Sequence, residues 1–234
     1  QGTLVHQEVA LDVGNKVCIL AGDFLLAKAA VELSLLDSSP VTEIVARGLE
    51  SIMEGDMMTA EYTEGGDDAL DAHLHIVRRR SAELIGNACQ CSAILSGHEA
   101  DSTVAQACLL FGNGIAMAQA LVAEAEATET PLKQRRRSAQ KVPHARPPSA
   151  PLLVAAGRYP EVHALLERGF SSSQDAAAMI EYLDASDAVG TTLRIATEHA
   201  QDAVEALEAL PISDTRKSLL VLSHKVLTGA SIKP

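Results

Sequence analysis

Aromatic residues are scarce in this sequence of 234 residues: they make up 3% of it, and tryptophan is absent. Stretches in which apolar and polar residues alternate, the pattern of a half-buried β-strand, are also lacking. Apolar residues nevertheless form 47% of the chain, with alanine and leucine prominent, and these two favour helices. So large an apolar share excludes a mainly disordered chain and suffices for a sizeable core. The sequence therefore predicts an all-α fold in one domain, residues 1–234.

Metal-binding spacings are absent as well. The four cysteines, at positions 18, 89, 91 and 108, include no C-x-x-C pair. A separation of two residues places side chains about 200° apart on a helix. Neither Cys89 with Cys91 nor His73 with His75 can therefore share a metal ion from one helix face. We expect free thiols, a reducing compartment and no metal bound by this chain.

Positive charge is in deficit, with 19 Lys and Arg against 31 Asp and Glu, which gives a net charge of −12. Nucleic-acid binding requires a positive surface that displaces counterions, so DNA is excluded as a general partner. The sequence also lacks an uninterrupted apolar run of about 18 residues, the length at which a membrane-spanning helix is considered.

Apolar residues recur at helical spacing along nearly the whole chain. Residues 1–13 carry no strong signal, and a helix is predicted to begin at Gly14. The third predicted helix is long, and we expect a kink or a break near Gly86. Together the predicted helices cover residues 14–36, 41–62, 67–96, 101–127, 150–157, 160–169, 173–185, 187–209 and 213–228.

The segment 128–148 is basic and interrupted by prolines, and it contains no acidic residue after Glu129. Such a composition predicts an exposed loop. Three roles stay open for it: a solvated loop, a contact with anionic lipid or with a diphosphate-bearing substrate on a neighbouring subunit, or a contact with RNA or an acidic protein. Its candidate contact residues are Lys133, Arg135, Arg136, Arg137 and Lys141.

Several segments, in order and at matching spacing, resemble the trans-polyprenyl diphosphate synthase family. The run Gly14–Lys16 followed by Leu20–Ala27 resembles the GNKxxxLAGDFLLA helix of that family. Further resembling segments are Met53–Met57, Arg80–Ile85, Phe111-Gly112, Ser149–Leu153, Ser186–Val189 and Ala196–Leu207. The resemblance implies an isoprenoid synthase-type helical bundle around a central cavity. We expect the N-terminal helices of the full fold, with the first aspartate-rich motif, to lie before residue 1.

The second aspartate-rich motif of the family, DDxxD, falls on Ala123–Ala127, where the sequence reads AEAEA. In the family this motif holds Mg²⁺ ions, and the spacing i, i+1 and i+4 places its carboxylates on one helix face. Here two of the three aspartates are alanine, and Glu124 and Glu126 point about 200° apart. We therefore predict no catalytic residues and no metal ligands in this chain.

This pattern most resembles the non-catalytic second subunit of heteromeric long-chain synthases of the decaprenyl or solanesyl type. The resemblance implies an accessory subunit in the synthesis of the ubiquinone side chain, which stabilises an active subunit and shapes its product tunnel. The active subunit would carry both aspartate motifs and the Mg²⁺, in a heterodimer or heterotetramer. The implied place is the matrix side of the mitochondrial inner membrane, with the plastid as the alternative.

Two other functions remain open. A degenerate synthase fold could serve as a structural subunit of a large mitochondrial or plastid complex. An active homomeric synthase would need Glu124 to replace the whole aspartate triad.

The resemblance also supplies candidate residues. The vestigial diphosphate-binding candidates are Arg80, Gln119 and Glu124; for Arg80 and Glu124 the alternative is an ordinary solvated or cavity-lining side chain. The subunit-interface candidates are Leu20, Asp23, Phe24, Leu26, Ala27, Ile52 and Met53, where the alternative for the apolar members is the protein's own core.

Overall fold

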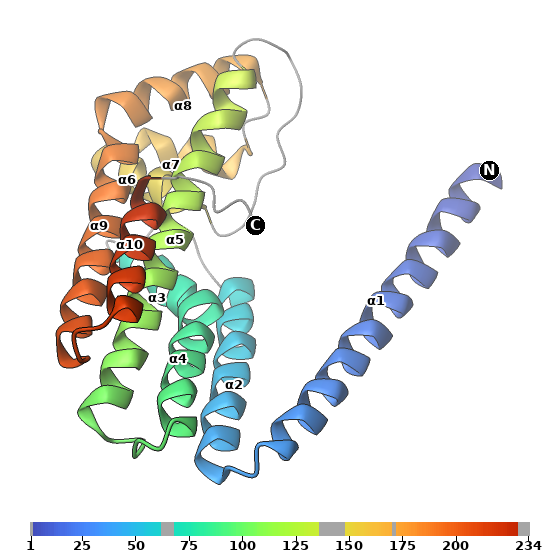
Figure 1. Ribbon diagram of the computed structural model, residues 1–234. Coiled ribbons are helices and arrows are strands. Elements are labelled where there is room, and N and C mark those ends of the chain that lie inside the picture. Colours follow the sequence, from blue (N-terminus) through green and yellow to red (C-terminus); the bar gives the residue numbers. More distant parts are fainter. Residues whose placement is uncertain (1, 62–67, 136–147, 170–171, 229–234) are drawn as a thin grey trace. The chain divides into compact units, whose positions relative to one another are not determined.

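The computed structural model describes residues 2–61, 68–135, 148–169 and 172–228, and every regular element in these ranges is helical (Figure 1). The predicted all-α class is therefore confirmed. In chain order the elements are α1 (Gly2–Leu35), α2 (Ser39–Glu61), α3 (Ala69–Val77), the π-helical turn η1 (Arg78–Ala82), α4 (Glu83–Leu95), α5 (Thr103–Arg135), α6 (Ala150–Arg158), α7 (Glu161–Glu167), α8 (Ser173–Ala185), α9 (Ala188–Ala206), the 3₁₀ turn η2 (Leu207–Ala209) and α10 (Asp214–Thr228).

Two predicted helix ends are wrong. Helix α1 begins at Gly2 rather than at Gly14, because an isolated glycine inside a long helix costs only about 1 kcal/mol relative to alanine. Helix α5 continues through Pro131 to Arg135 instead of ending at Ala127. A proline inside a long helix can bend it rather than end it, and leucine, lysine and glutamine after Pro131 are good helix formers.

The described chain forms two compact units, residues 1–43 and 44–234. The first unit contains α1, whose residues 14–32 are all exposed to solvent within this chain. Its large apolar side chains lie on every side of the helix and not on one stripe, which is unusual for a solvated helix. The prediction of a single domain over residues 1–234 stays a prediction.

Helix α5 is the central helix of the second unit and packs against α4 and α9 (Figure 1). Leu121 is fully buried on α5 and packs with the buried alanines Ala196 and Ala200 of α9. Met117, almost fully buried as well, packs with Val77 and Ala82. The part of α5 from Thr103 to Thr128 is long and apolar enough to span a membrane, but 56% of its apolar window is buried inside this chain. That burial is typical of the core helix of a globular unit.

Glycines allow α5 to approach its neighbours closely. A Cβ atom at Gly86 of α4 would lie 2.1 Å from Oδ1 of Asn113, and one at Gly112 would lie 2.7 Å from the Cα of Gly86. On the other side, a Cβ at Gly114 would lie 2.5 Å from the carbonyl oxygen of His199. Gly86 is thus a packing glycine, and the break predicted there is wrong. The irregularity lies at the π-helical turn Arg78–Ala82 instead.

The cysteines are free thiols: Cys18 is exposed, and the other three are half-buried or buried. Burial raises the pKa of Cys89, and the neighbouring Cys108 adds to the increase. Burial also raises the pKa values of Cys91 and Cys108. These groups therefore stay protonated near neutral pH, which makes them poor nucleophiles and poor metal ligands.

We expect Gly86→Ala to destabilise the protein, because the added methyl group collides with Asn113 on α5. Overpacking of this kind costs about 1–3 kcal/mol of unfolding free energy, which urea denaturation measures. The matched control is Gly157→Ala in α6, where an added Cβ meets nothing within 4 Å. The control should be neutral or stabilising by about 0.5–1 kcal/mol. Equal stability of the two variants would contradict the close crossing.

We expect His199 to make the fold less stable in acid. Burial lowers the pKa of His199 from its ordinary 6.5, and Arg78 lowers it further, while Asp202 and Glu198 partly oppose the shift. The unfolded chain therefore takes up this proton at higher pH than the folded chain. The stabilising contribution is complete above pH 6.5 and is lost as the pH falls towards the folded pKa. His199→Gln should reduce the loss of unfolding free energy between neutral and mildly acidic buffer, and an unchanged loss would contradict this account.

Candidate functional site

The segment Ala123–Ala127 lies on α5 and presents methyl groups where the family resemblance places two aspartates. Ala123, Glu126 and Ala127 are exposed, Ala125 is buried, and Glu124 is half-buried. Positions 123 and 127 are one turn apart on the same face, whereas position 124 points elsewhere. The two missing carboxylates are therefore those of the exposed face.

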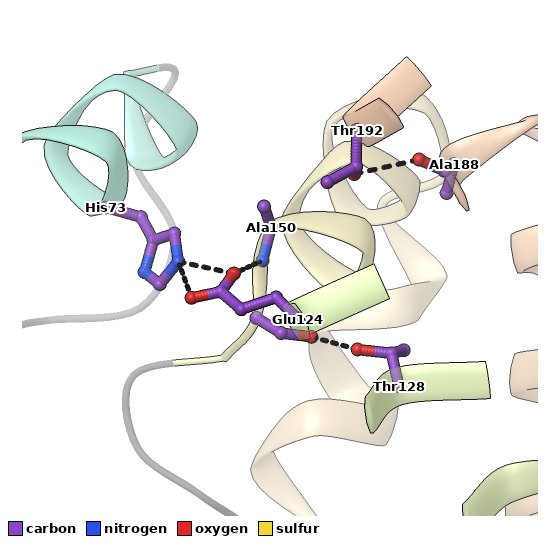
Figure 2. A network of polar contacts seen from close by, with 7 residues as sticks. His73, Glu124, Thr128, Ala150, Ala188 and Thr192 are labelled. Atoms are coloured by element: carbon purple, nitrogen blue, oxygen red, sulfur yellow. Dashed lines mark hydrogen bonds and ion pairs between the residues drawn. The ribbon is translucent and has the colours of Figure 1, made fainter. Parts of the chain in front are cut away.

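The carboxylate of Glu124 forms hydrogen bonds with two other parts of the same chain. Its Oε1 and Oε2 atoms lie 3.0 and 2.9 Å from Nε2 of His73 on α3, and Oε2 also accepts a hydrogen bond of 2.8 Å from the backbone N–H of Ala150 (Figure 2). Glu124 thus joins α3, α5 and the first residue of α6. We call this arrangement the Glu124 clasp.

The clasp provides a hydrogen-bond acceptor for the backbone N–H of Ala150 at the start of α6. The first backbone N–H groups of a helix have no intrahelical acceptor, and a negative charge is favourable beside them. Ser149 precedes α6 but does not cap it with its side chain. Its hydroxyl lies 2.5 Å from the hydroxyl of Thr128 instead, which ties the residue before α6 to α5. Glu124 supplies the missing acceptor.

His73 is 3% exposed and donates through Nε2 to Glu124, while its Nδ1 is buried without a hydrogen-bond partner among the described residues. The tautomer with hydrogen on Nε2 fits both observations, because a buried lone pair without a donor is less costly than a buried N–H without an acceptor. From sequence alone, His73 is a candidate only for a metal ligand, paired with His75. Its true partner lies 51 residues away in the sequence, and no local pattern reveals such a pairing.

This segment does not fit a Mg²⁺ ion. Both oxygens of Glu124 already have partners, and Glu126 is exposed on another face. Among the residues that the structure describes, no group of three His, Cys, Asp or Glu side chains could hold a metal ion. A hard divalent cation needs several oxygen ligands together, and α5 offers at most one here.

Arg80 lies on the π-helical turn and pairs with α2. Its Nε donates to Oδ1 of Asp56 at 2.6 Å, and Arg79 donates in parallel to Glu54 at 2.5 Å. A Cβ at Gly55 would lie 2.6 Å from Cγ of Arg80, so this glycine allows the close contact. Both pairs are largely exposed, so each contributes only about 0–1 kcal/mol.

The three vestigial candidates do not form one site in this structure. Arg80 and Gln119 are exposed, whereas Glu124 turns towards α3 and α6. Gln119 and Glu124 are five residues apart on α5, which separates their directions by about 140°. Arg80 keeps guanidinium N–H groups available for a phosphate beside its pair with Asp56.

The interface candidates are exposed within this chain, apart from Ile52. Leu20, Phe24 and Leu26 are 66%, 63% and 51% exposed on α1, and Asp23 and Ala27 are also exposed. On α2, Met53 is 55% exposed and Ile52 is half-buried. Of the basic contact candidates, Lys133 and Arg135 belong to the last turns of α5, and Arg136, Arg137 and Lys141 lie outside the described residues.

Comparison with known proteins identifies the family. The profile of the polyprenyl synthetase family matches residues 3–121, just over half of the chain, and the match ends shortly before Ala123. Mitochondrial solanesyl-diphosphate synthase 1 of Oryza sativa subsp. japonica is 31% identical over 92% of this chain and 51% of its own length. Decaprenyl-diphosphate synthase of Dictyostelium discoideum is 32% identical over 92% of this chain and 46% of its own.

Two further similarities bear on assembly and fold. Decaprenyl-diphosphate synthase subunit 1 of Schizosaccharomyces pombe is 29% identical over 92% of this chain and 58% of its own length. The apo structure of an Arabidopsis medium/long-chain prenyl pyrophosphate synthase superimposes with a TM-score of 0.80 at 26% identity, covering 97% of this chain and 77% of that one. The chain thus spans about half the length of the curated relatives first compared. It belongs to the polyprenyl synthetase family.

Proposed function

We propose that this chain is a catalytically inactive accessory subunit of a heteromeric long-chain prenyl diphosphate synthase that serves the ubiquinone side chain. The partner carries both aspartate motifs, the Mg²⁺ and the diphosphates, and this chain stabilises it and shapes its product tunnel. The mitochondrial names of several relatives support a mitochondrial location, and we propose the matrix side of the inner membrane.

The Glu124 clasp is the observation that carries this proposal. Glu124 falls on the middle aspartate of the second motif. Its carboxylate is held by His73 and by the backbone N–H of Ala150. The face that would present carboxylates to a metal presents Ala123 and Ala127. Diphosphate ionisation in this family depends on Mg²⁺, so a segment 123–127 that offers no set of metal ligands supports a partner that supplies them.

Helix α1 supports the heteromeric part of the proposal. Its side chains, such as Leu20 and Phe24, are exposed in this chain on a helix that is apolar all round. Apolar surface of this extent marks a contact with another protein surface. The Schizosaccharomyces pombe relative is named as a subunit 1, and this name supports a heteromeric assembly.

Native purification tests the proposal. The tagged chain is isolated from mitochondria, its partners are identified by mass spectrometry, and the eluate is assayed for prenyl transfer with an allylic diphosphate and isopentenyl diphosphate. We expect a synthase with both DDxxD motifs to co-purify and activity to require both chains. Co-purification with an unrelated large complex and no prenyl transfer would support a structural subunit instead. Mg²⁺-dependent turnover by this chain alone would contradict the proposal.

Replacing Glu124 should change stability and leave catalysis intact. Glu124→Ala leaves a buried His73 and the Ala150 N–H without their acceptor, and we expect a loss of about 1–3 kcal/mol in unfolding free energy. Glu124→Gln retains a carbonyl acceptor and should lose less. Glu126→Gln, on the exposed face, is the matched control and should lose nothing.

The same variants separate a structural role from a metal-binding one. In the reconstituted heteromer, prenyl transfer per assembled complex should be unchanged within about twofold for Glu124→Gln, since a true Mg²⁺ ligand would cost far more. A large loss of turnover that excess Mg²⁺ restores, with stability unchanged, would show that Glu124 binds the metal.

A further inference from the structure

A second candidate site lies at the other end of α6. A cavity of about 430 Å³, partly open to solvent, is lined by α6, α7 and the first turns of α3 and α9. Its apolar wall includes Leu70, Leu153 and Val154, and its polar wall includes Arg158, His163 and Thr191. The volume falls in the range of sites for small organic molecules. Neither the family motifs nor the Glu124 clasp involve these polar side chains.

The polar wall presents hydrogen-bond donors in fixed positions. Nη1 of Arg158 donates to the carbonyl oxygen of Ser186, which anchors the guanidinium and leaves its other N–H groups for a ligand. Oγ1 of Thr191 accepts a 2.9 Å hydrogen bond from Arg194, so its hydroxyl hydrogen can be donated. His163 is half-buried beside them. The guanidinium of Arg158 thus lines the cavity, and that of Arg194 is bonded to one of its lining residues, Thr191.

Gly157 lies at the exposed rim of the cavity. It lies inside α6, its φ is in the ordinary helical region, and a Cβ there would meet nothing within 4 Å. Neither a turn nor a close approach therefore requires glycine, although glycine in a helix costs about 0.5–1 kcal/mol relative to alanine. A larger side chain can therefore be introduced at the rim without a clash with the protein.

We propose that this cavity binds a small amphiphilic anion, with its apolar chain against Leu70, Leu153 and Val154 and its carboxylate or phosphate head beside Arg158, His163 and Thr191. Guanidinium groups hold both types of head through paired N–H groups. The site does not depend on the proposed accessory function. The seven residues from Ala150 to Gly157 place it about 10 Å along α6 from the Glu124 clasp.

Calorimetric titration of the full chain tests the site. The probes share a ten-carbon tail and differ in the head: decanoate, decyl phosphate, 1-decanol and decyltrimethylammonium. We expect at least one of the two anions to bind at least tenfold more tightly than 1-decanol, and the stronger anion identifies the head group. Equal or tighter binding of the alcohol or the cation would overturn the proposal, as would the absence of anion binding below 1 mM.

Two variants locate the binding. Gly157→Leu should obstruct the rim of the cavity and weaken anion binding at least tenfold without lowering the Tm, and Gly157→Ala is the matched control that should retain most of the affinity. His163→Gln should weaken anion binding and leave 1-decanol unaffected. Unchanged anion affinity in both Gly157→Leu and His163→Gln would show that the anion binds elsewhere, and would overturn the proposal while leaving the accessory-subunit hypothesis intact.

Discussion

A carboxylate that is partly removed from water must find hydrogen-bond donors, and the first N–H groups of a helix must find acceptors. Glu124 and α6 satisfy each other, and His73 completes the arrangement. Much of the second unit depends on this contact. It fixes where α6 begins, it holds α3 against α5, and with the pair Thr128–Ser149 it closes the base of the basic segment. Because α6 also forms the wall of the cavity at Arg158, both candidate sites rest on the same short helix.

The electrostatics of this segment differ in kind from those of an aspartate-rich motif. Several carboxylates on one helix face repel each other, and bound cations offset this repulsion. A single carboxylate between an imidazole N–H and a helix N-terminus has its partners in the folded chain. The exposed alanines at positions 123 and 127 add no further negative charge. The Glu124 carboxylate thus has its hydrogen-bond partners without a metal ion, as the accessory-subunit hypothesis expects.

The helices of this chain were accessible from sequence because their apolar residues recur at helical spacing and because Pro40 and Gly97 mark boundaries. The packing role of Gly86 could not be predicted from sequence, because a glycine in a helix indicates a kink and a close helix crossing equally well. The loss of the second aspartate motif could be predicted from five consecutive residues. The partner of Glu124 could not, because His73 is 51 residues away and carries no local signal. The cavity at Gly157 was likewise invisible, since its walls come from four separate helices.

Helix α1 places the strongest constraint on assembly. Transferring a leucine or phenylalanine side chain from water to a packed interface contributes about 1.5–3 kcal/mol. Leu20, Phe24 and Leu26 alone expose more than half of their surface here. Because apolar residues surround α1, one flat surface would cover only part of them. The accessory-subunit hypothesis therefore predicts that α1 is contacted on more than one side. On that hypothesis α1 retains the apolar sequence of a synthase because assembly needs it, whereas the acidic motif on α5 serves only to hold a metal.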